Sequence, residues 1–302
     1  MERAGETQLL DRPVQATRPS ATLSTIRTIL LHVQDDPSLD SRIENALVLA
    51  RSCSAHLSCL HVVPIEAYVA FDQFGGLFVM NDVMKALDEQ QAELRTKIEA
   101  KLGSEDVNWD YEEVTGSVAA QLIGHAALTD LVITSREPHR TEFVGSTVSF
   151  LGDLICNSRT PLFIPTDDGR PVDVTGSVLI AWDCSYEAAN AVRSAVGLLK
   201  LASSVHILQI REDGKDEAFP STRLLEYLSR HGVHAEYSVI EAGVDVHDQK
   251  VISDTLAARA QALRAAYLVM GGYNHSRVGE YIFGGVTRTM LAEAPLPLVI
   301  AH

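Results

Sequence analysis

Residues 177–210 read SVLIAWDCSYEAANAVRSAVGLLKLASSVHILQI. The first apolar run ends at Asp183 and a short polar turn, and the apolar positions that follow have helical spacing. A second apolar run begins at Ser204, so the order is strand, turn, helix, strand. This is the unit from which parallel sheets are built, and it predicts an α/β fold.

The same unit occurs earlier in the chain. Residues 26–63 contain the apolar run IRTILLHV, the polar turn DDPSLDSR, the helical pattern IENALVLARSCSA and the apolar run HLSCLHVV. The interval from Asp35 to His61 is 26 residues, as is the interval from Asp183 to Gln209. Matching units at matching spacing predict an internal duplication.

The later part of each repeat matches as well. The stretch AAQLIGHAALTDLVITS, 119–135, resembles AARAQALRAAYLVMGG, 257–272, and the closing strands are TPLFIP, 160–165, and LPLVIA, 296–301. Alternating strands and helices imply parallel strands joined by right-handed crossovers. We therefore expect two tandem open parallel-sheet domains, Rossmann-like in type, with these boundaries: a loose tail 1–24, a first domain 25–165, a linker 166–176 and a second domain 177–302.

Composition limits the function. The net charge of −15 argues against a nucleic-acid partner, which requires clustered Lys and Arg. The four cysteines show no metal-binding pattern and are expected to be free thiols in a reducing compartment. No apolar run reaches the length of a membrane span, and the N-terminal stretch lacks the apolar core of a secretory signal. We expect a cytoplasmic protein with neither a nucleic-acid nor a membrane partner.

Two glycine pairs flank a polar loop in residues 270–291, MGGYNHSRVGEYIFGGVTRTML. The first pair follows the predicted strand YLVM, and the second opens a predicted helix beginning at Gly284. Ligands of open parallel sheets gather at the carboxyl ends of strands, and the free backbone N–H groups at a helix start attract anions. Together these features favour phosphate binding, and a tight turn without a ligand is the alternative.

The loop resembles the ATP-binding motif of the universal stress protein family, Gly-x2-Gly-x9-Gly-[Ser/Thr]. The strand VLIAWD, 178–183, and the closing PLPLVIAH, 295–302, also resemble strands of that family, and the likeness extends over both repeats. It implies a tandem universal stress protein, with the adenine nucleotide α-hydrolase-like fold, that binds ATP together with Mg²⁺. The residues that the resemblance places at the nucleotide are Ala181, Trp182, Asp183, Met270, Gly271, Tyr273, Asn274, Gly284, Gly285, Val286 and Thr287.

The motif departs from the family pattern at two positions. Asn274 replaces the second glycine, and Asn is the non-glycine residue that best tolerates left-handed backbone. Gly285 replaces Ser or Thr, and the lost hydrogen bond to a terminal phosphate costs about 1.5–3 kcal/mol. His275, Ser276 and Arg277 are either replacement contacts or a solvated loop. Asp183 either contacts a ribose hydroxyl or a metal, or caps the next helix.

The first repeat has no glycine after its strand DLVITS, and Gly145-Ser146 lies further from the closing strand than Gly284 does. We expect this repeat to have lost nucleotide binding, although Arg136, His139 and Arg140 leave anion binding open there.

No arrangement specific to a catalysed reaction is present, so slow ATP hydrolysis is the most activity that we expect. Three functions stay open. The first is a stress-response regulatory protein that binds an adenine nucleotide in its second domain. The second is a tandem scaffold or interaction module without nucleotide, and the third is a weak adenine-nucleotide hydrolase. By fold analogy, the closing strands are expected to be neighbours in an internal pseudo-dimer, and two chains to pair further as a homodimer.

Overall fold

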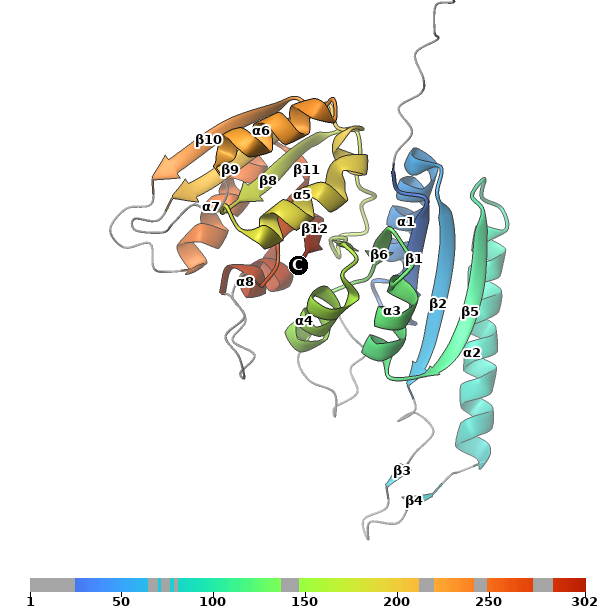
Figure 1. Cartoon of the computed structure of the whole chain (residues 1–302). Helices are drawn as coiled ribbons and strands as arrows, with labels where there is room; N and C mark the ends of the chain where they lie inside the picture. Colours follow the sequence, from blue (N-terminus) through green and yellow to red (C-terminus); the bar gives the residue numbers. More distant parts are fainter. Residues whose placement is uncertain are drawn as a thin grey trace, which may run out of the picture.

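A computed structural model of the chain describes residues 25–64, 70–71, 77–78, 81–136, 147–211, 220–241, 249–273 and 285–302 (Figure 1). The first half of the chain contains β1 (Thr28–Val33), α1 (Leu39–Cys53), β2 (His56–Pro64), β3 (Ala70–Phe71), β4 (Leu77–Phe78), α2 (Asn81–Leu102), β5 (Trp109–Gly116), α3 (Val118–Ala126), β6 (Leu131–Ile133), α4 (Thr147–Ser158) and β7 (Leu162–Ile164). The second half contains β8 (Ser177–Trp182), α5 (Tyr186–Leu199), β9 (Ser204–Arg211), α6 (Ser221–Arg230), β10 (Ala235–Glu241), α7 (Gln249–Ala262), β11 (Ala265–Gly271), α8 (Gly285–Glu293) and β12 (Leu298–Ala301).

One ten-stranded sheet runs through both halves in the order β10-β9-β8-β11-β12-β7-β6-β1-β2-β5. Within this sheet all neighbouring strands of one half are parallel, and the two halves meet where β12 pairs antiparallel with β7. Strands β3 and β4 pair antiparallel in a separate two-stranded sheet. Phe163 lies opposite Val299 at the centre of the β7–β12 pair, with Leu298 opposite Ile164 on one side and Ile300 opposite Leu162 on the other. The closing strands of the two repeats are therefore neighbours, related by a local two-fold axis. The α/β parallel-sheet architecture predicted from the sequence is confirmed.

Side chains alternate between the two faces of the sheet because strands have a period of two residues. On one face, residues such as Leu31 and Ile180 pack with α1, α2, α5 and α6, and we call this the α1/α5 face. On the other, residues such as Leu30 and Leu179 pack with α3, α4, α7 and α8, and we call this the α4/α8 face. Each face carries one apolar cluster that continues across both halves, so the seam between them is part of the core.

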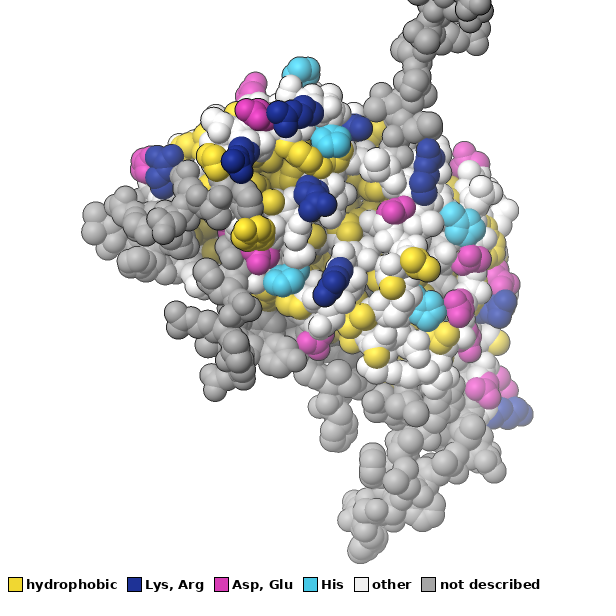
Figure 2. Space-filling model, viewed as in Figure 1, with side chains coloured by type: hydrophobic (Ala, Val, Ile, Leu, Met, Phe, Trp, Pro, Cys, Tyr) yellow, Lys and Arg dark blue, Asp and Glu magenta, His cyan; other side chains and the backbone are white. Residues whose placement is uncertain are grey.

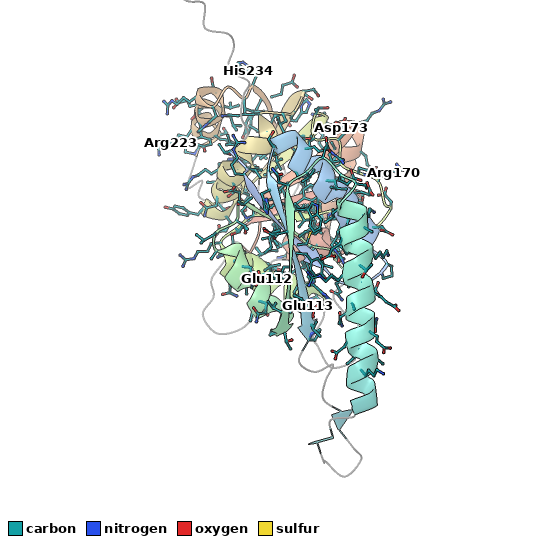
Figure 3. The ribbon with its side chains drawn as sticks, turned by 90° about the vertical axis from the view of Figure 1, so that its right-hand side faces the viewer. Glu112, Glu113, Arg170, Asp173, Arg223 and His234 are labelled. Carbon is teal, nitrogen blue, oxygen red and sulfur yellow. The ribbon has the colours of Figure 1, made fainter. Side chains whose placement is uncertain are left out.

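The helical patterns read from the sequence are present, with some shifted boundaries. Helix α1 begins at Leu39, so the end of the predicted polar turn DDPSLDSR is already helical. Two strands that sequence reasoning did not identify, β5 and β10, form the edges of the sheet. Their residues are half-buried or exposed and none is fully buried, as expected for strands at the edge of a sheet. Figure 3 shows α2 standing beside β5, on which Glu112 and Glu113 are labelled.

The predicted linker between the repeats packs along α1. Ser41 Oγ donates to the carbonyl of Thr166 at 2.9 Å, and the backbone N–H of Val172 donates to Asn45 Oδ1 at 2.9 Å. In this linker Val172 and Val174 are buried. Arg170, which precedes them in the chain, is exposed; Figure 3 labels Arg170 and Asp173. No described helix is both long and apolar enough to cross a membrane.

We expect Phe163→Ala to destabilise the whole chain by about 3–5 kcal/mol, because the ring is fully buried at the strand pair that joins the halves. Thermal denaturation followed by calorimetry measures this, and both halves should melt in one transition. Leu128→Ala is the control, because Leu128 is 92% exposed. Two separate transitions in the wild-type protein would contradict the role given to the seam.

Candidate functional site

The strand order reverses once in each half, between β8 and β11 and between β1 and β6, where the first strand of a half lies beside its fourth. Ligands of open α/β sheets bind outside the carboxyl ends of the strands at this position, which we call a switch point. The second switch point contains the residues that the resemblance assigns to nucleotide. The first has a different set of side chains.

The exit of β8 leads directly into the start of α5. Asp183 is exposed, and its Oδ1 accepts a hydrogen bond from the backbone N–H of Ser185 at 3.1 Å. Ser185 Oγ in turn caps α5 by accepting from the N–H of Ala188 at 3.0 Å. Asp183 therefore stabilises the turn before α5, and the cap of that helix is Ser185 and not Asp183. Ala181 is half-buried and Trp182 is buried, so neither side chain is displayed at the surface.

The exit of β11 passes very close to α5. A Cβ atom at Gly271 would lie 2.5 Å from the backbone N of Ala188 and 2.7 Å from the carbonyl carbon of Glu187. Only glycine fits this contact, so Gly271 has a packing role whether or not a ligand binds. Met270, just before it, is buried on the α4/α8 face.

Tyr273 and Thr287 tie this exit to the start of α8. Tyr273 has a left-handed backbone, with φ of 63°, and its N–H donates to Thr287 Oγ1 at 3.4 Å. Thr287 is buried, so its hydroxyl serves the protein's own backbone in this structure. Burial raises the pKa of the Tyr273 phenol.

Helix α8 begins at Gly285, followed by the half-buried Val286. A Cβ atom at Gly285 would lie 1.6 Å from Gln249 Oε1 and 2.6 Å from Gln249 Cδ. The carboxamide of Gln249, the first residue of α7, thus occupies the space that a Ser or Thr side chain at 285 would need. Asn274 and Gly284 lie outside the described residues, as do His275, Ser276 and Arg277.

Glu187 is a candidate site residue that sequence reasoning missed. It lies in the first turn of α5, next to Gly271, and its Oε2 atom is buried without a hydrogen-bond partner among the described residues. In the sequence it reads as an ordinary acidic residue that stabilises a helix start, so no local signal distinguishes it. On the α1/α5 side of the same exit, Gln209 Nε2 donates to Cys184 Sγ at 3.4 Å, and Tyr237 donates to Gln209 Oε1.

At the first switch point a fully buried arginine fills the space over the strand ends. Arg42 is 0% exposed; its Nε donates to the carbonyl of His32 at 3.0 Å and its Nη2 to the carbonyl of Gln34 at 2.8 Å. Its Nη1 contacts both carboxylate oxygens of Asp36, at 2.9 and 2.8 Å, and Ser135 Oγ at 2.7 Å. Burial lowers the pKa of Arg42, and the pairing with Asp36 opposes this shift. The guanidinium cross-links β1, α1 and the exit of β6.

Arg136, considered above for anion binding, reaches into the second half. Its Nη1 donates to the carbonyl of Ala294 at 2.7 Å and its Nη2 to the carbonyl of Leu296 at 3.3 Å. These carbonyls follow the end of α8, so Arg136 caps that helix across the seam. His139 and Arg140 lie outside the described residues.

Within the described ranges, no group of His, Cys, Asp or Glu is arranged to hold a metal ion. On the face shown in Figure 2, Lys and Arg lie among other side chains and do not form a continuous basic patch.

We expect Gly271→Ala to be far more destabilising than Gly285→Ala. The first Cβ meets rigid backbone, and overpacking of this kind costs about 1–3 kcal/mol or more. The second meets the far end of a flexible glutamine, which can rotate away. Urea denaturation of both variants checks the order, and equal losses would contradict the different packing described for the two glycines.

Arg42→Ala should destabilise the first half by about 3–5 kcal/mol, because it leaves the Asp36 carboxylate without its buried partner. Arg51→Ala is the matched control on the same helix, because Arg51 forms only surface ion pairs with Glu105 and Asp106. Chemical denaturation of both variants measures the difference. A mild effect of Arg42→Ala would mean that the network is not a structural support.

Comparison with known proteins agrees with this architecture. Residues 175–302 match the model of the universal stress protein family. No curated protein matches the chain. A universal stress protein from Archaeoglobus fulgidus DSM 4304 superimposes with a TM-score of 0.68 at 16% identity, covering 91% of this chain and 97% of that one.

Two Pseudomonas aeruginosa structures also resemble the whole chain. A putative universal stress protein from strain UCBPP-PA14 has a TM-score of 0.51 at 17% identity, with 93% of this chain and 95% of that one covered. A protein of unknown function from strain PAO1 has a TM-score of 0.53 at 17% identity, with 93% and 94% covered. At these identities the likeness establishes the doubled fold. The C-terminal part of the chain, residues 175–302, thus matches the universal stress protein family model, and the chain as a whole has the fold of a double-length universal stress protein structure.

Proposed function

We propose that the second half binds an adenine nucleotide, ATP with Mg²⁺, at the second switch point and acts as a stress-response regulatory protein. The observation that carries this proposal is Glu187 Oε2, a buried carboxylate oxygen at the start of α5 that has no hydrogen-bond partner in the described part of the chain. Buried polar atoms are nearly always paired, so an unpaired acceptor beside Gly271 calls for a donor from a ligand. Ribose hydroxyl groups and the adenine amino group are such donors.

A second carboxylate lies on the same strand-to-helix connection. Asp183 follows β8 directly and is exposed, and its Oδ1 accepts a hydrogen bond from the Ser185 N–H. A carboxylate is an acceptor, and a ribose hydroxyl can donate to it. Two acceptors at one strand exit suit the nucleoside end of the ligand and not its phosphates.

The phosphates would lie toward the start of α8. The first backbone N–H groups of a helix lack partners within it, and the helix dipole favours an anion there. Gly285 contributes no side chain, and the carboxamide of Gln249 stands beside it in place of the hydroxyl that the family motif supplies. The Thr287 hydroxyl accepts a hydrogen bond from the Tyr273 N–H, so we assign it to holding Tyr273 and not to catalysis.

A tandem scaffold without nucleotide is the second candidate. It is favoured by the packing of Gly271 against α5 and of Gln249 against Gly285, since both glycines are then explained without a ligand. The weak hydrolase is not favoured by any contact among the described residues. We infer a regulatory protein whose conformation, and not a catalysed reaction, responds to bound nucleotide.

We expect freshly purified protein to release adenine nucleotide when denatured, detectable by liquid chromatography with mass spectrometry. Protein stripped of nucleotide should bind ATP in the presence of Mg²⁺ at one site per chain in calorimetric titration. A clean extract together with no heat of binding would reject nucleotide binding and leave the scaffold.

Glu187→Gln should weaken ATP binding about tenfold or more, because hydrogen bonds to a charged acceptor are worth about 1.5–3 kcal/mol. The stability of the nucleotide-free protein should not fall, because Oε2 has no partner to lose. Glu226→Gln, on the exposed face of α6, is the control and should leave binding unchanged. Equal affinities for wild type and Glu187→Gln would remove Glu187 from the site.

A further inference from the structure

Among the described residues of the first half, two buried nitrogen donors have no hydrogen-bond partner. They are Gln34 Nε2 and Arg136 Nε, on side chains of residues that are 5% and 8% exposed. Gln34 follows the last residue of β1, and Arg136 lies three residues beyond the end of β6. Unpaired buried donors are costly and rare, so two at one place require an explanation.

The register of the sheet makes these two residues neighbours. In the β1–β6 ladder Leu31 pairs with Ile133, and His32 Nδ1 then contacts Thr134 Oγ1 at 3.2 Å. Continuing this alignment places Gln34 opposite Arg136, about 5 Å apart at their backbones as in any pair of adjacent strands.

The alternation along each strand also points both side chains toward the same face. Leu30 and Val132 lie on the α4/α8 face. Gln34 is four residues after Leu30 and Arg136 four residues after Val132, so an even number of residues separates each pair and their side chains point to the same face. The contacts of Arg136 agree, because they reach the carbonyls that follow α8. Both unpaired donors are therefore at the first switch point, on the side of the seam.

Arg136 is also a buried cation with neutral partners. Its two terminal nitrogens donate to backbone carbonyls, and in the described part of the chain it forms no salt bridge within 4.0 Å. Arg42 nearby differs, because its charge is paired with Asp36. Burial lowers the pKa of Arg136, with Asp167 acting in the opposite direction. A buried, unpaired positive charge is unfavourable, and an anion would relieve it.

We propose that Gln34 and Arg136 form a binding site for a small oxygen anion, a phosphate or a carboxylate, at the first switch point. One N–H from each residue would bind one anion oxygen, and the charge of the Arg136 guanidinium would be balanced.

The second switch point has an acidic residue and no arginine at the corresponding positions. There Asp183 follows β8, and Gly272 takes the place of Arg136 when the two halves are aligned through their closing strands. The two halves therefore have different ligand chemistry.

Gln34→Met is the decisive variant, because methionine keeps the length of the side chain and removes the amide. Gln209→Met is the matched control: Gln209 is equally buried, at 4% exposed, but its amide is paired with Cys184 and Tyr237. Melting temperatures are measured in an anion-poor buffer, then with added sodium phosphate, sodium acetate or sodium chloride at equal ionic strength.

Without added anion, we expect Gln34→Met to melt no lower than wild type and Gln209→Met to melt lower. Phosphate or acetate should raise the melting temperature of wild type and of Gln209→Met by several degrees, saturably, and leave Gln34→Met unchanged. Whichever salt acts identifies the anion as phosphate or carboxylate.

Three results would overturn the proposal. One is an equal rise in Gln34→Met, which would place the anion elsewhere, for instance at α8. Another is a response of wild type no larger than that to chloride. The last is a loss of stability in Gln34→Met without anion, which would mean that the amide already has a fixed partner such as a water molecule.

Discussion

The antiparallel pairing of β7 with β12 is the contact on which the molecule depends. Each repeat ends in a short, fully apolar strand whose outer edge would otherwise be an unpaired row of backbone groups. Pairing the two edges satisfies those groups and joins the apolar clusters on both faces into continuous layers. The crossing contacts, Arg136 to the end of α8 and Ile155 of α4 against Gly272, follow from the alignment that this pair sets.

Much of the fold could be predicted because it depends on short-range patterns. The apolar runs, the helical spacing and the equal intervals in the two repeats indicated parallel α/β units, and each of these is present. The edge strands β5 and β10 were missed because half of their residues are polar and they resemble loops. The start of α1 was misplaced for a related reason, since Asp40, Ser41 and Arg42 read as a polar turn although Arg42 faces inward.

The candidate site was less predictable, because its properties arise from residues distant in sequence. Gly271 and Gly285 do lie where a side chain would meet a close neighbour, but whether a loop glycine faces a phosphate or the protein's own atoms cannot be read from the sequence. Glu187, Gln34 and Arg136 stand out only once their surroundings are known, since an unpaired buried atom has no sequence signature. These three residues are identified as candidate ligand contacts by their burial at the strand ends, and not by their residue type.

The single antiparallel junction in an otherwise parallel sheet also fixes where the two switch points open. Strands of the first half run opposite to those of the second. The carboxyl ends of the two sets of strands therefore lie at opposite ends of the shared sheet, measured along the strand direction. Occupants of the two sites could neither touch nor crowd one another. Each end of the sheet can therefore carry its own set of side chains, with Arg42 and Arg136 at one and Asp183 and Glu187 at the other.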